Sequence, residues 1–187
     1  MTPWKQELER RLAEPGAPVV RGLYLNRFTS PAGRLADAVP SLRRDAVVSL
    51  HTALDEAGAY NNPPSGVTAV VPLDPGPTRP RIGRVDTEQG PVFVRAMPRR
   101  LLEAGDVEDR LDLTRSAAHP HSTAEKALLD WLYLATSARS TLAPPAPHDI
   151  DMDQLDRARL KRLAKSMALE DTLQRWLTGK LLTRQLR

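Results

Sequence analysis

Two histidines that flank a proline are the first candidates for chemistry in this sequence. His119 and His121 surround Pro120, and in an extended segment both imidazole rings could face one metal ion. A metal site in a protein needs three or four ligands, and the sequence alone places no third ligand beside them. The alternative is a loop before a helix that carries two partly exposed histidines.

Three aspartates form a second candidate, for calcium. Asp149, Asp151 and Asp153 alternate like the first ligands of an EF-hand loop, which also needs Gly at its sixth position and Glu at its twelfth. Here those positions hold Gln154 and Leu160, so the sequence does not predict a calcium loop. Acidic residues at the start of a helix interact favourably with its dipole, which explains the aspartates more simply.

The common catalytic motifs are missing from the sequence. There is no Gly-rich phosphate loop, no Gly-x-Ser-x-Gly, no His-Glu-x-x-His and no cysteine that could act as a nucleophile or zinc ligand. Nothing in the sequence brings the carboxylates of Asp55 and Glu56, or of Glu103 and Asp106, opposite a substrate. We therefore expect a protein that is not an enzyme and that carries no cofactor and no metal.

Composition and charge predict a soluble protein with one basic end. The 187 residues are 41% hydrophobic and 27% charged, and neither a membrane-spanning run nor a signal segment is visible, so we expect a cytoplasmic location. From Arg157 to Arg187 there are nine Lys and Arg residues against two Asp and Glu, whereas the rest of the chain has 18 against 21. Such an end can attract nucleic acid or an acidic protein, or can be a plain solvated helical face.

Two capped amphipathic segments predict helices on either side of a β-rich middle. Ser49 precedes apolar residues at helical spacing, and Gly58 ends that segment. Ser122 opens the second helix, in which we expect the Ser122 hydroxyl to accept the N–H of Glu125 while the Glu125 carboxylate reaches back. Trp131 lies on the apolar stripe of this second helix, which predicts a position in the core.

The remaining predicted elements are short. Strands are expected at 19–25, 67–73, 81–86, 92–97 and 111–117, with a hairpin loop at 87–90, and helices at 4–14, 31–44 (broken by Pro40), 99–104, 152–167 and 169–184. These elements predict an α+β fold in which a small mixed or antiparallel sheet is covered by helices and the chain ends in a basic helical pair.

Two blocks of the sequence resemble the AbiEi family, the antitoxins and autorepressors of type IV toxin–antitoxin operons. The block 47–58 (VVSLHTALDEAG) is similar to a family pattern of extended residues, Ser-Leu, and an Ala-Leu helix ended by Gly. The block 123–133 (TAEKALLDWLY) is similar to the family's Glu-Lys-Ala-Leu-x-Asp-x-x-Tyr helix. The segment 20–24 (VRGLY) resembles the Arg-Gly-x-Tyr wing of the family's N-terminal winged helix, and the whole resemblance covers about 19–176.

The resemblance implies a division of the chain and a partner. Residues 45–187 would form the antitoxin domain, and residues 1–44 a reduced winged-helix-like fragment with its linker. Only the segment 4–14 precedes the wing here, where a winged helix has about three helices. DNA binding would then rest on that helix with the Arg21 wing, lie in the basic C-terminus, or be lost. The partner that the family implies is a cognate nucleotidyltransferase-like toxin.

These features favour an antitoxin that neutralises such a toxin and can also repress its own operon. The sequence leaves open whether neutralisation is by contact or by modification. The alternative is a DNA-binding transcriptional repressor without toxin contact, and a third class is an enzyme that acts on nucleic acid. We expect this chain alone to bind operator DNA only weakly, and we expect no membrane partner. The apolar side of the helix 152–167 should dock on the domain and leave its cations outward. The expected binding residues are Arg157, Arg159, Lys161, Arg162 and Lys165, together with Arg21.

Overall fold

A four-stranded mixed sheet lies at the centre of the protein. The computed structural model describes residues 17–21, 23–25, 33–62, 64–77, 79–114, 120–138 and 140–181. The strands are β3 (Val47–Val48), β4 (Val67–Leu73), β5 (Gly83–Thr87) and β6 (Gly90–Pro98), in the order β3-β4-β6-β5. Strands β4 and β6 are parallel, whereas β3 pairs with β4 and β5 pairs with β6 in antiparallel fashion. This confirms the predicted strands at the centre of the chain and the α+β class.

The hairpin between β5 and β6 forms where the sequence predicts it. Gly90 has φ 118°, a conformation that a residue with a side chain rarely adopts. The Thr87 hydroxyl donates to the Gly90 carbonyl at 2.6 Å and accepts from the N–H of Gln89 at 3.2 Å. These two bonds fix the tight turn and so set the register in which β5 lies along β6.

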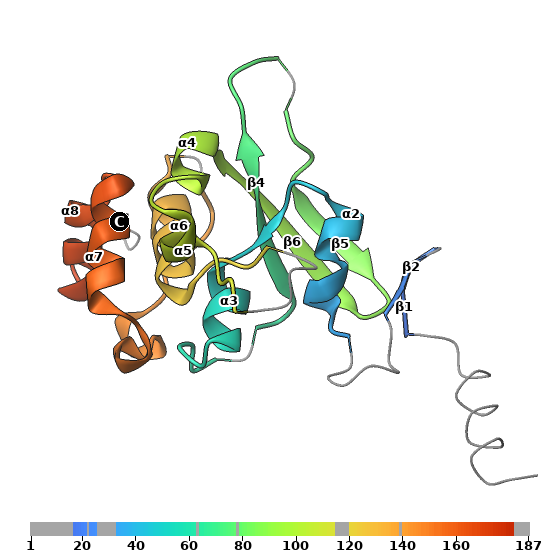
Figure 1. Ribbon diagram of the computed structural model, residues 1–187, viewed down its shortest axis with the longest axis horizontal. Helices are drawn as coiled ribbons and strands as arrows, with labels where there is room; N and C mark the ends of the chain where they lie inside the picture. Colours follow the sequence, from blue (N-terminus) through green and yellow to red (C-terminus); the bar gives the residue numbers. More distant parts are fainter. Residues whose placement is uncertain are drawn as a thin grey trace, which may run out of the picture.

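Helices cover one face of the sheet in two layers (Figure 1). Helices α3 (Leu50–Glu56) and α6 (Ala124–Thr136) lie nearest to the sheet, and α7 (Arg157–Ser166) and α8 (Glu170–Leu177) pack on the far side of α6. One continuous core joins these layers, and its fully buried members include Leu54, Val70, Leu128, Leu132, Leu163 and Trp176. The predicted C-terminal helical pair is confirmed, with shorter helices than expected.

The other face of the sheet is covered by short elements. A 3₁₀ turn, η1 (Leu35–Ala38), continues into α2 (Val39–Leu42), and their Ala36 and Val39 pack against Val48, Ala69 and Val94. Pro40 lies in the first turn of α2, where its missing N–H breaks no helical hydrogen bond. The predicted helix 31–44 is therefore two short elements, as the proline suggests, with residues 31 and 32 outside the described part.

The N-terminal region forms a hairpin of β1 (Ala17–Val20) and β2 (Leu23–Leu25), where we had predicted one interrupted strand. Arg21 lies exposed in the turn between the two strands. Val19 and Leu25 are buried against Ala38 in a small third cluster. The helix predicted at 4–14 lies outside the described residues.

The strand predicted at 111–117 is wrong. Leu111 makes one isolated bridge with Ser122, and the chain turns at 113–114; residues 115–119 lie outside the described part. The Asp112 carboxylate accepts the N–H of Thr114 at 3.1 Å and its hydroxyl at 2.6 Å. This Asx turn ends the extended segment, because the aspartate replaces the strand partner that the Thr114 backbone would otherwise need.

The linking elements between these layers are single helical turns. They are α4 (Arg99–Leu102), α5 (Val107–Arg110) and the 3₁₀ turns η2 (Pro147–Asp149) and η3 (Met152–Gln154). The helix expected at 152–167 begins as η3 and restarts as α7 after Asp156. Among the described residues, no helix has the length and apolar character that a membrane crossing requires.

Helix α6 begins one residue later than expected. Thr123, not Ser122, occupies its N-cap, and the Thr123 hydroxyl accepts the N–H of Lys126 at 3.3 Å. Glu125 does not reach back to the start of its own helix. Trp131 is buried as predicted, with its indole N–H donating to the Ala143 carbonyl at 2.8 Å.

Candidate functional site

Helix α7 carries five of the six predicted binding residues, and its apolar side docks on the domain as expected. Asp156 caps the helix by accepting the N–H groups of Ala158 and Arg159 at 2.8 and 3.0 Å. Leu160 and Leu163 are buried in the main core. The cap fixes where the helix starts, and the leucines fix which of its sides faces solvent.

Two of the five cations, Arg159 and Arg162, pair with carboxylates of the domain, although the Arg162 side chain remains 57% exposed. The Arg162 guanidinium makes a bidentate contact with Asp109 of α5, at 2.9 and 2.6 Å. Arg159 lies 3.5 Å from the same carboxylate through Nε and 3.4 Å from Glu125 through Nη1. The Arg162 guanidinium also holds the pKa of the Asp109 carboxyl below its ordinary value. Arg159 and Arg162 therefore attach α7 to the domain.

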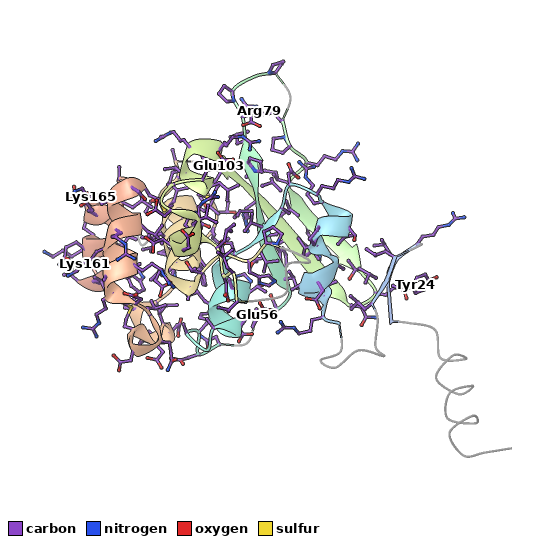
Figure 2. All side chains as sticks on the ribbon, in the orientation of Figure 1. Tyr24, Glu56, Arg79, Glu103, Lys161 and Lys165 are labelled. Carbon is purple, nitrogen blue, oxygen red and sulfur yellow. The ribbon has the colours of Figure 1, made fainter. Side chains whose placement is uncertain are left out.

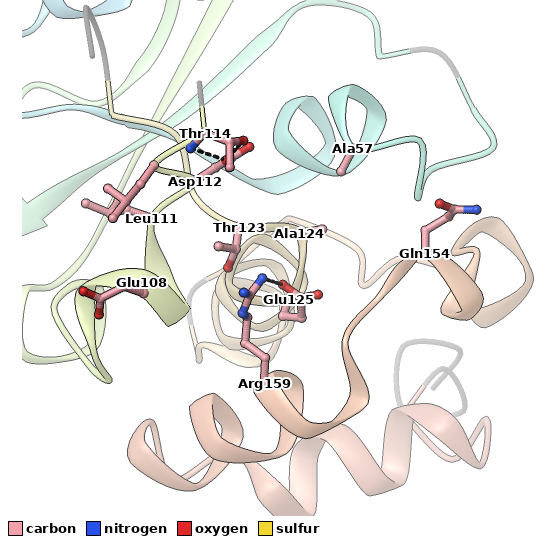
Figure 3. A pocket seen from close by; sticks show the side chains of 11 residues that line it. Ala57, Glu108, Leu111, Asp112, Thr114, Thr123, Ala124, Glu125, Gln154 and Arg159 are labelled. Atoms are coloured by element: carbon pink, nitrogen blue, oxygen red, sulfur yellow. Dashed lines mark hydrogen bonds and ion pairs between the residues drawn. The ribbon is translucent and has the colours of Figure 1, made fainter. Parts of the chain in front are cut away.

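Glu125 explains why Arg159 turns inward (Figure 3). This buried carboxylate accepts the N–H of Asp156 at 2.7 Å with one oxygen and faces Arg159 with the other. It lies in the first turn of α6, and it binds the residue that caps α7. The glutamate thus joins α6 to the start of α7, which supplies both an N–H donor, at Asp156 31 residues away, and a cation.

The remaining cations of α7 are exposed (Figure 2). Arg157 makes a solvent-exposed ion pair with Asp153 at 3.4 Å. Lys161 and Lys165 point outward, and within the described part of the chain no carboxylate lies within ion-pairing distance of either. The β1–β2 hairpin, whose turn contains Arg21, lies at the end of the molecule opposite to α7 and α8 in Figure 1. The structure therefore brings Lys161 and Lys165 together but does not bring Arg21 to them.

A groove of about 410 Å³ runs between α7 and α8 beside these two lysines, and we call it the lysine groove. Its apolar surface comes from Ala164, Leu173 and Leu177, and Leu177 remains 44% exposed. Glu170 is the one acidic residue in its lining. A groove with apolar walls and two unpaired ammonium groups can hold an apolar side chain of a partner while the lysines engage carboxylates beside it.

A second hollow, of about 450 Å³, lies where α5 and the 111–114 turn approach the start of α6 (Figure 3). Among the described residues of its lining, Glu108, Asp112 and Glu125 are acidic and Arg159 is the one cation. Within the described residues, no three His, Cys, Asp or Glu side chains are grouped so that they could hold a metal ion. The lining of the hollow is therefore acidic, but its described residues do not form a metal site.

The predicted His-x-His pair divides between the described and undescribed parts of the chain. His119 lies outside the described residues. His121 is buried, with Nδ1 3.0 Å from the Glu56 carboxylate, so the prediction of a partly exposed loop histidine is wrong for it. Arg34 contacts the other oxygen of Glu56 at 3.2 Å. His121 thus helps to join the loop before α6 to the end of α3.

The sequence blocks 47–58 and 123–133 meet in a buried polar cluster, which the sequence analysis does not predict. Ser49 of the first block donates its hydroxyl to Asp130 of the second at 2.7 Å, and Lys126 forms an ion pair with the same carboxylate. All three side chains are buried. Burial raises the pKa of Asp130, while Lys126 and Ser49 oppose that shift. The sequence signal is a Lys and an Asp four residues apart in a helix that is mostly apolar.

Comparisons with protein-family models, with characterised proteins and with solved structures found no match to this chain.

Proposed function

We propose that this chain is a non-enzymatic antitoxin that neutralises a nucleotidyltransferase-like toxin by direct contact through the lysine groove. The family is suggested by the two sequence blocks described above. The observation that carries the choice of contact surface is the pair Lys161 and Lys165, which are exposed beside an apolar groove and have no carboxylate partner in the described part of the chain.

The chemistry of the two surfaces is complementary. An enzyme that transfers nucleotides holds its metal ions with carboxylates, and the metal ions contact the phosphates, so its active site contains acidic groups. The excess positive charge of this chain lies in its last 31 residues, and long-range attraction would steer such a partner to that end. Once docked, Lys161 and Lys165 would pair with carboxylates, and Leu177 would bury its exposed surface.

The structure changes which residues should be tested. Arg159 and Arg162 hold α7 on the domain, so reversing their charge would disturb the fold as well as any interface. Lys161 and Lys165 make no ion pair with a carboxylate in the described part of the chain. The double variant Lys161→Glu with Lys165→Glu therefore tests docking, and Arg44→Glu with Arg100→Glu is a matched control, because both arginines are exposed elsewhere on the surface.

The experiment is co-expression with the gene encoded beside this one, with growth rescue and pull-down as readouts. The unaltered chain and the arginine control should restore growth and retain the partner. The lysine variant should bind the partner about tenfold or more weakly, while its melting temperature stays nearly unchanged. A neighbouring gene that is not toxic, or full rescue by the lysine variant, would contradict the proposal.

Repression through DNA alone is the second candidate, favoured by the exposed Arg21 in the β1–β2 turn. A phosphate-contacting cation on a hairpin gives salt-dependent affinity without base reading. A sequence-selective footprint at nanomolar concentration, lost in Arg21→Ala and kept in the lysine variant, would favour this candidate over toxin contact.

A further inference from the structure

A third groove lies on a part of the molecule that the proposed toxin contact does not use. It encloses about 620 Å³ between the strands β5 and β6 and the C-terminal end of α6, and we call it the arginine groove. Tyr133 and Leu134 line it from α6, Arg95 from β6, and Arg79 from the loop between β4 and β5. Figure 2 shows Arg79 on that loop and the groove lysines on α7, so the two grooves lie on different parts of the surface.

The two arginines of this groove have no counter-ion. Neither Arg79 nor Arg95 has a carboxylate within ion-pairing distance in the described part of the chain, and no described lining residue is acidic. The carboxylates of Asp74 and Asp86 already form ion pairs with other arginines. Asp74 binds Arg99 at 2.6 Å, and Asp86 binds Arg84 at 2.6 Å. The groove therefore keeps two positive charges that no carboxylate of the described residues neutralises.

Arg95 makes this arrangement costly without a ligand. It is half-buried in the middle of β6 and also lines a smaller hollow of about 140 Å³ beside His51 and Phe93. A guanidinium that is partly removed from water loses hydration, and that loss is balanced only when an anion or hydrogen-bond acceptor takes the place of water. Burial, assisted by the charge of Arg95, lowers the pKa of the neighbouring His51 to about 4.

Hydroxyl donors and apolar walls complete the groove. Ser140 accepts the N–H of Leu142 at 3.0 Å, which leaves its own proton for a ligand. The Tyr133 hydroxyl has no hydrogen bond within the described residues. Ile82, which is 63% exposed, and Leu134 supply apolar surface. The volume falls in the range of about 300–1,000 Å³ that is typical of small-molecule sites.

We infer that the arginine groove binds a phosphate-bearing ligand of nucleotide size, with the phosphate on Arg79 and Arg95 and the base on the apolar wall. A phosphate monoester carries up to two charges and three terminal oxygens, so it can serve two guanidinium groups and a hydroxyl together. A single carboxylate has one charge and two oxygens and would leave one arginine unneutralised. The ligand is either a free nucleotide or the 5′-phosphorylated end of a nucleic-acid strand.

Calorimetric titration of the full chain tests this inference. The probes are the four 5′-mononucleotides, adenosine, and a 5′-phosphorylated hexathymidine. We expect saturable binding of at least one mononucleotide or of the strand, and adenosine should bind at least tenfold more weakly than the mononucleotide AMP. Tighter binding of the strand than of any mononucleotide would assign the ligand to a nucleic-acid end, and the reverse order would assign it to a free nucleotide.

Two variants place the binding in the groove. Arg95→Met keeps the length of the side chain, and Arg79→Ala removes an exposed one; each should weaken binding about tenfold or more, with melting curves recorded as a check on the fold. Arg100→Ala removes an exposed arginine outside the groove and should leave the affinity unchanged. Absence of saturable binding by every phosphorylated probe, or unchanged affinity in both groove variants, would overturn the inference.

Discussion

Removing the ammonium group of Lys126 should reveal how strongly the buried polar cluster depends on charge pairing. The Lys126 side chain is 1% exposed and that of Asp130 is not exposed at all, so water cannot replace either partner. In Lys126→Met the side chain keeps its length, and Asp130 keeps only the hydroxyl of Ser49 at 2.7 Å. Breaking a buried ion pair on one side typically costs about 3–5 kcal/mol, and we expect a loss of that size at pH 7.

The pH dependence of this loss gives a second check. Burial already raises the pKa of Asp130, and removing the attracting ammonium group raises that pKa further. A carboxyl whose folded pKa is above its unfolded value binds protons more tightly in the folded state. The destabilisation of Lys126→Met should therefore be largest above the folded pKa of Asp130 and should shrink as the pH falls toward the unfolded value of 3.8.

A double-mutant cycle measured by urea unfolding separates pairing from packing. Lys126→Met combined with Asp130→Asn removes both charges and keeps an acceptor for the Ser49 hydroxyl. The double variant should be more stable than the sum of the two single losses predicts, by about 1–3 kcal/mol. Additive losses, or a cost below about 1 kcal/mol for Lys126→Met alone, would refute the view that this ion pair within α6 stabilises the buried cluster.

Two further predictions concern the partly buried His51 and the ion pairs that attach α7 to the domain. Burial, assisted by the charge of Arg95, lowers the pKa of His51 from 6.5 to about 4, so the folded state binds fewer protons than the unfolded state between these values. The free energy of unfolding should therefore fall by about 2–3 kcal/mol as the pH drops from 6.5 to 4. In a pH series of thermal melts, His51→Asn should flatten this part of the curve. An unchanged slope would show that His51 does not titrate as described. Reversing Arg159 and Arg162 to Glu places like charges beside Asp109 and Glu125 and should lower the melting temperature clearly, whereas reversing Lys161 and Lys165 should change stability by less than about 0.5 kcal/mol. Equal melting temperatures for these two double variants would show that the ion pairs of Arg159 and Arg162 contribute nothing to the stability of the fold.

The elements of this fold could largely be predicted from sequence because their signals are local. Strand β4 is a run of apolar residues between proline-rich segments, and the β5–β6 hairpin has its glycine where the turn needs it. The end of α3 follows from Gly58, which has φ 71°. Each of these features depends on residues within about one turn or one strand of each other, which is the range that sequence patterns describe well.

The contacts of the candidate sites could not be predicted because they join distant parts of the chain. Glu125 has the sequence position of a capping residue, yet its partner Asp156 is 31 residues away. Arg162 follows the helical spacing of an outward cation, yet it faces Asp109 on a helix that the sequence did not predict. Charge patterns along a helix show which residues share a face, but the position of the acidic neighbour decides whether that face is free to bind a partner.

Zero-length cross-linking of the co-purified complex tests the lysine groove most directly. A carbodiimide joins a lysine amine to a carboxylate, and this chain has only five lysines, which are Lys5, Lys126, Lys161, Lys165 and Lys180. Lys126 is buried and already paired with Asp130. We expect the cross-links to the partner to form at Lys161 and Lys165 and to reach acidic residues of its active site. Cross-links confined to Lys5 or Lys180, with the groove lysines unmodified, would contradict the proposed contact.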